Sequence, residues 1–203
     1  MKASDQKVIT AYLQQLYADY RHTADIEAKA RFFSPDCRQI CRPTPAFAAR
    51  DRDTIMRYLR ETSGKGKDRI QQFVEDPDKK TTISGLAKDS AAGSSIRSKS
   101  FYTIRPLIDG ERDFGNDETA LPAGYNSADS IKLRAEREGW VGMRVDLWDD
   151  DGTNDEGKGL GILVKVQYWW KQGPPGEWLQ ILHDIMYIGS RDGTEGTQGQ
   201  VLD

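Results

Sequence analysis

One histidine in an apolar stretch has the clearest capacity for acid–base chemistry in this sequence. His183 lies in the run LQILHDIMYI, where apolar residues recur as they do in a half-buried β-strand. An imidazole titrates near neutral pH and can accept and return a proton at a reacting centre. Burial would lower its pKa unless a carboxylate lay nearby. His183 is therefore the first candidate for a catalytic role, and a histidine hydrogen-bonded within the core is the alternative.

Four more polar residues could assist such chemistry. Tyr168 could donate a proton, and Gln39 could polarise a carbonyl group. Cys41 lies two residues after Gln39 in an extended phrase, on the same side, and would line the pocket. If the register of this phrase shifts by one residue, Arg38 replaces Gln39 inside and becomes a clamp for an oxyanion or a carboxylate. Cys37 and Cys41 would lie about 13 Å apart in a strand, which is too far for a disulfide.

Three long β-type runs must position His183, and they cover residues 140–148, 161–170 and 178–187. Strict alternation along each run puts His183 on one face with Met143, Val164 and Val166. If the strands pair so that their apolar side chains share one face of the sheet, His183 lies beside Val164 or Val166. We expect these residues to line an apolar pocket, together with Tyr17 from the first helix.

The opposite face of these runs combines polar side chains with Trp148, Trp169 and Trp178. Solvated polar faces rarely carry three tryptophans, so this face predicts a partly buried partner surface. A homodimer is the simplest partner. The alternative is a second polar site at Arg144 and Asp146.

Helices precede the strands. Apolar residues that recur every three or four positions predict a helix from about residue 5 to 20. Shorter helices are predicted at about 25–33 and 51–64. Residues 76–98 contain few apolar side chains and predict a long mobile loop. Residues 189–203 carry four glycines and predict a disordered tail. We expect one domain over residues 1–188.

Composition narrows the classes of partner. Lys and Arg number 29 against 32 Asp and Glu among 203 residues, and the basic residues form no long block, which disfavours nucleic acid. No run approaches the length of about 18 apolar residues needed to cross a bilayer, and the N-terminus does not read as a signal peptide. We expect a cytoplasmic protein without a membrane partner, a metal site or a cofactor.

The order of elements resembles that of a known superfamily. Helices, the phrase FFSPDCRQICRP, a helix beginning near RDRDTIMRYL and long strands ending in EWLQILHDIMYIG resemble the nuclear transport factor 2-like superfamily over about residues 5–188. The resemblance implies an α+β fold with a cone-shaped, curved antiparallel sheet covered by N-terminal helices. It also implies frequent dimers through the outer face of the sheet.

Members of that superfamily include ketosteroid isomerase, scytalone dehydratase and SnoaL-like polyketide cyclases, alongside non-catalytic binding modules. The ketosteroid isomerase pattern places a catalytic carboxylate where this sequence has Cys41 or Arg42, and the scytalone dehydratase site uses a histidine pair, whereas His22 ends the first helix here. We therefore expect a cofactor-independent isomerase, cyclase or dehydratase that acts on a small hydrophobic metabolite through His183, Tyr168 and Gln39. The alternative is a non-catalytic ligand-binding or protein-association module of the same fold.

Overall fold

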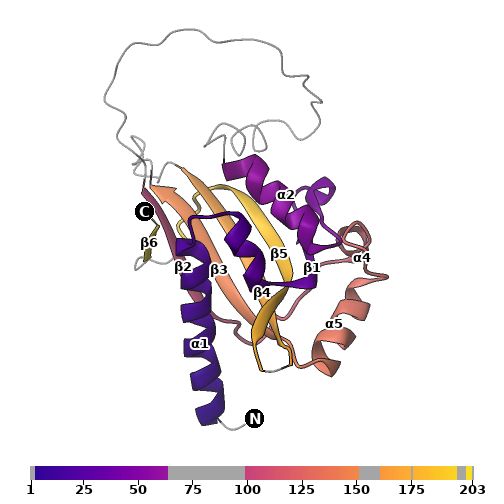
Figure 1. Ribbon diagram of the computed structural model, residues 1–203. Coiled ribbons are helices and arrows are strands. Elements are labelled where there is room, and N and C mark those ends of the chain that lie inside the picture. Colours follow the sequence, from indigo (N-terminus) through magenta and orange to yellow (C-terminus); the bar gives the residue numbers. More distant parts are fainter. Residues whose placement is uncertain (1–2, 64–98, 151–160, 175, 196–199, 203) are drawn as a thin grey trace, which may run out of the picture.

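The computed structural model describes residues 3–63, 99–150, 161–174, 176–195 and 200–202 (Figure 1). The helices are α1 (Ala3–His22), η1 (Glu27–Phe32), η2 (Pro45–Phe47), α2 (Arg52–Ser63), α4 (Asp117–Ala120) and α5 (Ala128–Arg137). The strands are β1 (Phe33–Cys41), β2 (Lys99–Pro106), β3 (Val141–Asp150), β4 (Ile162–Gln172), β5 (Trp178–Ser190) and β6 (Gln200–Leu202). The α+β class and the curved sheet with N-terminal helices are confirmed.

The sheet has six strands in the order β1-β5-β4-β3-β2-β6. All neighbouring strands are antiparallel except β1 and β5, which run parallel. The curved sheet is therefore antiparallel as expected, apart from this one parallel pair at its edge. A parallel pair needs a long crossover connection, and here the chain between β1 and β5 includes three other strands of the sheet.

The sheet has a different cover on each face. On the first face, which we call the inner face, residues of α1, η1 and α2 pack with Tyr102, Val145, Val166 and other inward residues of the strands. On the outer face, residues of α4 and α5 pack with Ile40, Trp169 and Leu182. Figure 1 shows α1 close to β2, and α4 and α5 close to the β1 edge.

Two bulges interrupt the alternation of β5. Lys165 pairs with Tyr187 while Val166 pairs with Ile185, so Met186 is an extra residue between two ladder pairs. A similar shift, between the pairs of Trp169 and Trp170, makes Ile181 the second extra residue. Each extra residue exchanges the two faces for the rest of the strand. Within residues 182–185 the odd-numbered side chains therefore lie on the inner face. At both ends of β5 the even-numbered side chains lie there instead.

The bulges correct several expected positions. His183 lies on the inner face as expected, but its partner on β4 is Tyr168, so the expected place beside Val164 or Val166 is wrong. Gln180 shares the inner face with His183, although strict alternation separates them. Tyr187 lies over Lys165 on the outer face, where alternation predicted the inner one.

The three tryptophans do not form one exposed surface. Trp169 is 1% exposed because Phe114 of the same chain packs on it, with ring centroids 4.6 Å apart. Trp178 packs against the inner core, because the Ile181 bulge reverses its direction. Trp148 is buried and stacks on Phe101. The three indoles therefore do not form the exposed dimer surface that was expected. The homodimer itself stays a prediction.

Residues 107–137 lie between β2 and β3 and contain two helices, α4 and α5, which the apolar patterns of the sequence did not predict. Ser127 caps α5 with a reciprocal capping box to Ser130, and Ile131 and Ala135 bury its apolar side. The signal was present as Ser127 and Ser130 ahead of two apolar residues four positions apart. This segment supplies the cover of the outer face.

An ion pair anchors the same segment to the sheet. Arg42 follows β1 and binds Asp184 with two hydrogen bonds, from Nε to Oδ1 at 2.9 Å and from Nη2 to Oδ2 at 2.6 Å. Asp184 is fully buried on the outer face. Arg42 also donates to the side chain and the carbonyl oxygen of Asp113, each at 2.7 Å. One guanidinium thus joins β1, β5 and the segment that precedes α4.

The expected disordered tail is wrong where the structure describes it. Residues 200–202 form β6 and pair with β2, and Lys165 holds Asp192 and Thr194. The expected mobile loop at 76–98 lies outside the described residues. Among the described helices, none is long and apolar enough to cross a membrane.

Candidate functional site

His183 lies in the middle of the inner face and is enclosed by protein. Its ring is 4% exposed and makes edge contacts with Phe33 and Tyr168, at centroid distances of 5.1 and 4.6 Å. Nε2 is 2.5 Å from Oε1 of Gln180, so a neutral imidazole with its proton on Nε2 donates this hydrogen bond. Burial lowers the pKa of His183 to about 3. His183 therefore stays uncharged at neutral pH.

The buried histidine should make the protein sensitive to acid. A lowered pKa in the folded state gives stability that is complete above the unfolded pKa of about 6.5 and is lost as pH falls toward 3. Between pH 6.5 and 5 the loss should reach about 2 kcal/mol, at about 1.4 kcal/mol per pH unit. Urea unfolding of the protein and of His183→Leu at several pH values would measure the difference. The same change at the exposed His22 is the control, and an equal pH dependence in the protein and in His183→Leu would contradict the prediction.

The residues expected beside His183 are partly brought together. Gln39 pairs with His183 across β1 and β5, but its amide donates to the carbonyl oxygen of Phe47 at 2.8 Å. Cys41 lies on the same face, and burial raises the pKa of its thiol to about 11, which disfavours a nucleophilic thiolate. Both cysteines are free, as expected.

The apolar residues expected to line a pocket share the inner core: Met143, Val166, Tyr17 and Tyr168 are buried there, and Val164 packs against them. Arg38 lies on the outer side of β1, opposite Leu182, so the alternative with a shifted register is wrong. Two clefts, one between β1 and α5 and one between α1 and β2, are lined by other residues.

A charged residue on the apolar side of α1 was missed by the sequence reasoning. Leu13, Tyr17 and Arg21 are spaced by four, so Arg21 continues the apolar stripe of the helix and is itself half-buried. An arginine on an apolar helical stripe was the available signal. Four tyrosines lie near the Arg21 side chain: Tyr17, Tyr20, Tyr102 and Tyr168.

Some polar atoms of this region lack a hydrogen-bond partner. They are Nε of Arg21 and Nε2 of Gln180, and both are shielded from solvent. The hydroxyl of Tyr17 contacts that of Tyr168, and the Arg21 side chain hydrogen-bonds with that of Tyr20. No carboxylate among the described residues pairs with Arg21. Buried polar groups normally have a protein partner or an ordered water, and buried charges are normally paired. The cluster of Arg21 and its four tyrosines, which we call the tyrosine cluster, therefore holds a cation whose neighbours among the described residues are neutral phenols.

A second cation lies beside Arg21. Nζ of Lys29 donates to the carbonyl oxygen of Tyr20 at 2.6 Å and lies 4.5 Å from the centre of the Tyr20 ring. Burial and the neighbouring Arg21 lower the pKa of Lys29 to about 8. Lys29 binds the C-terminal end of α1, which gives it a structural role. It also adds positive charge at the tyrosine cluster.

A groove reaches the same region from outside. It has a volume of about 440 Å³ and runs between α1 and β2, and its lining includes Gln14, Ala18, Tyr102 and Ile104. Tyr102 contacts Tyr17 with ring centroids 5.3 Å apart, so the groove and the tyrosine cluster share a wall. This region offers cationic and hydroxyl donors beside apolar surface, which suits the anionic end of a small apolar molecule.

Comparison with known proteins identifies the family. The family model for the SnoaL-like domain matches residues 2–203. A ketosteroid isomerase-like protein from Erwinia carotovora atroseptica SCRI1043 is similar in structure, with 12% identity over 91% of this chain and 95% of that chain and a TM-score of 0.44. A structure described as a calcium/calmodulin dependent protein kinase II association domain, from Xanthomonas campestris, has 12% identity over 90% and 88% of the two chains and a TM-score of 0.40. No curated protein sequence matches the chain. Since the family model covers nearly the whole chain, the protein belongs to the SnoaL-like domain family of the nuclear transport factor 2-like superfamily.

Proposed function

We propose that this protein binds a small hydrophobic molecule with an anionic group, and that Arg21 holds that group on the inner face of the sheet. The observation that carries the proposal is the unpaired Nε of Arg21 inside the tyrosine cluster. An arginine keeps its charge at every pH at which the protein folds, so neutralisation by proton loss is not open to it. A carboxylate of the ligand would supply the missing partner.

The energetics favour a ligand over a purely structural arginine. The C-terminal dipole of α1 stabilises a cation in the last turn by about 0.3–1 kcal/mol. Removing one charge from water costs several kcal/mol when no partner compensates it. The dipole offsets only part of that cost. The hydroxyl of Tyr17, which contacts that of Tyr168, would add a second donor to the same anion.

Binding is favoured over acid–base catalysis at His183. A general acid or base works best with a pKa near the working pH, whereas burial holds the pKa of His183 at about 3. The expectation of an isomerase, cyclase or dehydratase acting through His183, Tyr168 and Gln39 stays untested. Turnover of a candidate metabolite that is abolished in His183→Ala would favour it.

The Arg21→Gln variant tests the proposal with two opposite effects. Binding of decanoate should weaken tenfold or more, because a charge-assisted hydrogen bond is lost. The melting temperature without ligand should stay unchanged or rise, because an unpaired buried charge is removed. Calorimetric titration with decanoate and with uncharged decanol would measure the first effect, and thermal unfolding would measure the second.

Arg31→Gln is the matched control, because Arg31 is an exposed arginine that lies over the ring of Phe32. It should alter neither decanoate binding nor stability. A structural Arg21 would give the reverse result: a clear fall in melting temperature in Arg21→Gln and equal binding of decanoate by the protein and the variant.

A further inference from the structure

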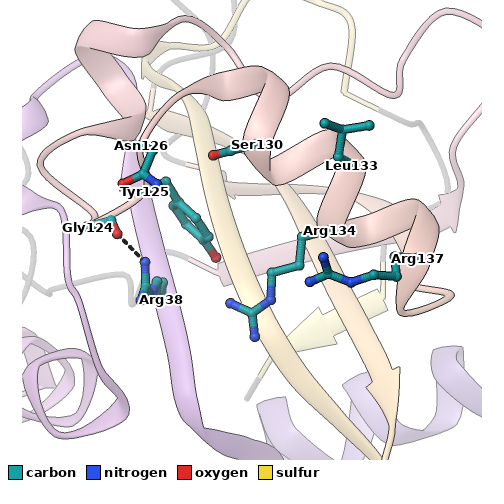
Figure 2. A pocket seen from close by; sticks show the side chains of 8 residues that line it. All are labelled: Arg38, Gly124, Tyr125, Asn126, Ser130, Leu133, Arg134 and Arg137. Carbon is teal, nitrogen blue, oxygen red and sulfur yellow. Dashed lines mark hydrogen bonds between the residues drawn. The ribbon is translucent and has the colours of Figure 1, made fainter.

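A second cleft lies on the other side of the molecule, between the β1 edge and α5. It has a volume of about 400 Å³, and Figure 2 shows the side chains that line it: Arg38, Gly124, Tyr125, Asn126, Ser130, Leu133, Arg134 and Arg137. Ser130, Arg134 and Arg137 come from one side of α5, and Arg38 comes from β1. The helix α5 and the strand β1 pack together on the outer face.

Positive charge dominates this cleft. Arg134 is neutralised by Asp36 and Glu138, at 2.9 Å in each case. Arg137 has only a long contact of 3.5 Å to Glu138 and is mostly exposed. Arg38 has no carboxylate partner among the described residues. Three guanidinium groups therefore face two carboxylates, and Arg38 is the group left without a counter-ion.

Arg38 is held in place by neutral contacts. Its Nη1 donates to the carbonyl oxygen of Gly124 at 2.5 Å, and its guanidinium lies 4.5 Å from the centre of the Tyr125 ring. Gly124 has a φ of +80°, and a Cβ there would lie 3.3 Å from Nη1 of Arg38. The turn can approach the arginine this closely only because the residue is glycine. The backbone thus fixes the guanidinium without neutralising it.

Two donors at this position have no acceptor. Nε of Arg38 and the hydroxyl of Tyr125 are shielded from solvent and lack a hydrogen-bond partner, and Tyr125 is 6% exposed. Figure 2 shows the side chains of Arg38, Tyr125 and Arg134 converging on the same space. A preorganised arginine beside a free hydroxyl is the arrangement that recognises carboxylate and phosphate oxygens.

We propose that this cleft is a binding site for the carboxylate or phosphate group of a small molecule, with Arg38 as the principal ligand and the Tyr125 hydroxyl as a second donor. The site is separate from the tyrosine cluster, because Arg38 lies on the outer side of β1 and Arg21 lies on the inner side of the sheet. The volume of the cleft suits a molecule of small-metabolite size. Binding here is independent of the function proposed for the inner face.

Nuclear magnetic resonance titration of the full chain tests this site directly. Inorganic phosphate and acetate are added in separate experiments, each against sodium chloride at the same ionic strength. We expect saturable shifts of the Arg38 Nε–H signal and of the Gly124 amide signal. Saturation by phosphate alone identifies a phosphate site, and saturation by acetate alone identifies a carboxylate site. Response to both identifies a general oxyanion site.

Arg38→Gln should weaken the binding at least tenfold, because a charge-assisted hydrogen bond is lost. Tyr125→Phe keeps the ring under the Arg38 guanidinium but removes the hydroxyl donor, so anion binding should weaken several-fold. Arg57→Gln is the matched control, since Arg57 is an exposed arginine 5.3 Å from the Tyr58 ring, and its affinity should equal that of the parent. Shifts no larger than those with sodium chloride, or equal affinity in Arg38→Gln, would overturn the proposal. If Arg38→Gln does not fold, Tyr125→Phe decides, with unchanged affinity counting against the site.

Discussion

Replacing Arg42 with methionine is expected to lower the free energy of unfolding by about 3–5 kcal/mol at neutral pH. The change removes both hydrogen bonds to Asp184, which is fully buried and would be left as an uncompensated charge. It also releases Asp113 and the segment before α4. Urea unfolding followed by circular dichroism would measure the loss.

The loss should depend on pH in a defined direction. Burial raises the pKa of Asp184, and the hydrogen bonds from Arg42 oppose that rise. Without Arg42 the folded-state pKa rises further above the unfolded value of about 3.9. The carboxyl is protonated in both states below pH 3.9, so the deficit of Arg42→Met should be smallest there. It should grow as pH rises toward neutrality, by up to about 1.4 kcal/mol per pH unit.

The double variant Arg42→Met/Asp184→Leu is the control for this interpretation. Replacing both partners of a buried ion pair with apolar residues is often neutral or stabilising, whereas removing one partner is costly. The double variant should therefore recover most of the stability that Arg42→Met loses. A loss below about 1 kcal/mol in Arg42→Met, or no recovery in the double variant, would contradict the role given to the pair.

Trp169→Ala is expected to cost about 3–5 kcal/mol as well, because it removes a large, fully buried ring. Phe114 and the guanidinium of Arg112 pack on the ring of Trp169, on the outer face of the sheet. The variant should loosen residues 107–137 more than the inner face. Thermal unfolding would measure the global cost, and hydrogen exchange of the backbone amides would locate the loosening.

Leu133→Ala is the control for this experiment, because Leu133 is an exposed apolar residue on α5. It should change stability by no more than about 0.5 kcal/mol. Equal exchange rates in residues 107–137 of Trp169→Ala and the parent would contradict the assignment of Trp169 as the anchor of this segment.

The sequence predicted the elements better than the faces. The apolar rhythm of residues 8–20 predicted α1, and the β-type runs predicted β3, β4 and β5 within a few residues, because both patterns are local. Alternation also put His183 on the inner face correctly. It did so although the strict alternation assumed for β5 fails at both ends of the strand.

The remaining errors have physical causes that no local pattern records. A bulge depends on how two strands pair, so Ile181 and Met186 look like ordinary strand residues in the sequence. The cover on Trp169 comes from Phe114, which is distant in sequence, so no pattern within the strand could reveal it. Arg21 was hidden by its position at the end of a helical stripe, where a cation also suits the helix dipole.

The two extra residues of β5 fit a strand of thirteen residues against the eleven residues of β4. If Ile181 and Met186 were both deleted, every other residue of β5 could keep its β4 partner, because each extra residue lies between two consecutive ladder pairs. His183 would stay opposite Tyr168, and Asp184 would stay opposite Gln167. The deletion would therefore remove the local bend and added twist that bulges give a strand, while the side chains beneath the helices stayed the same.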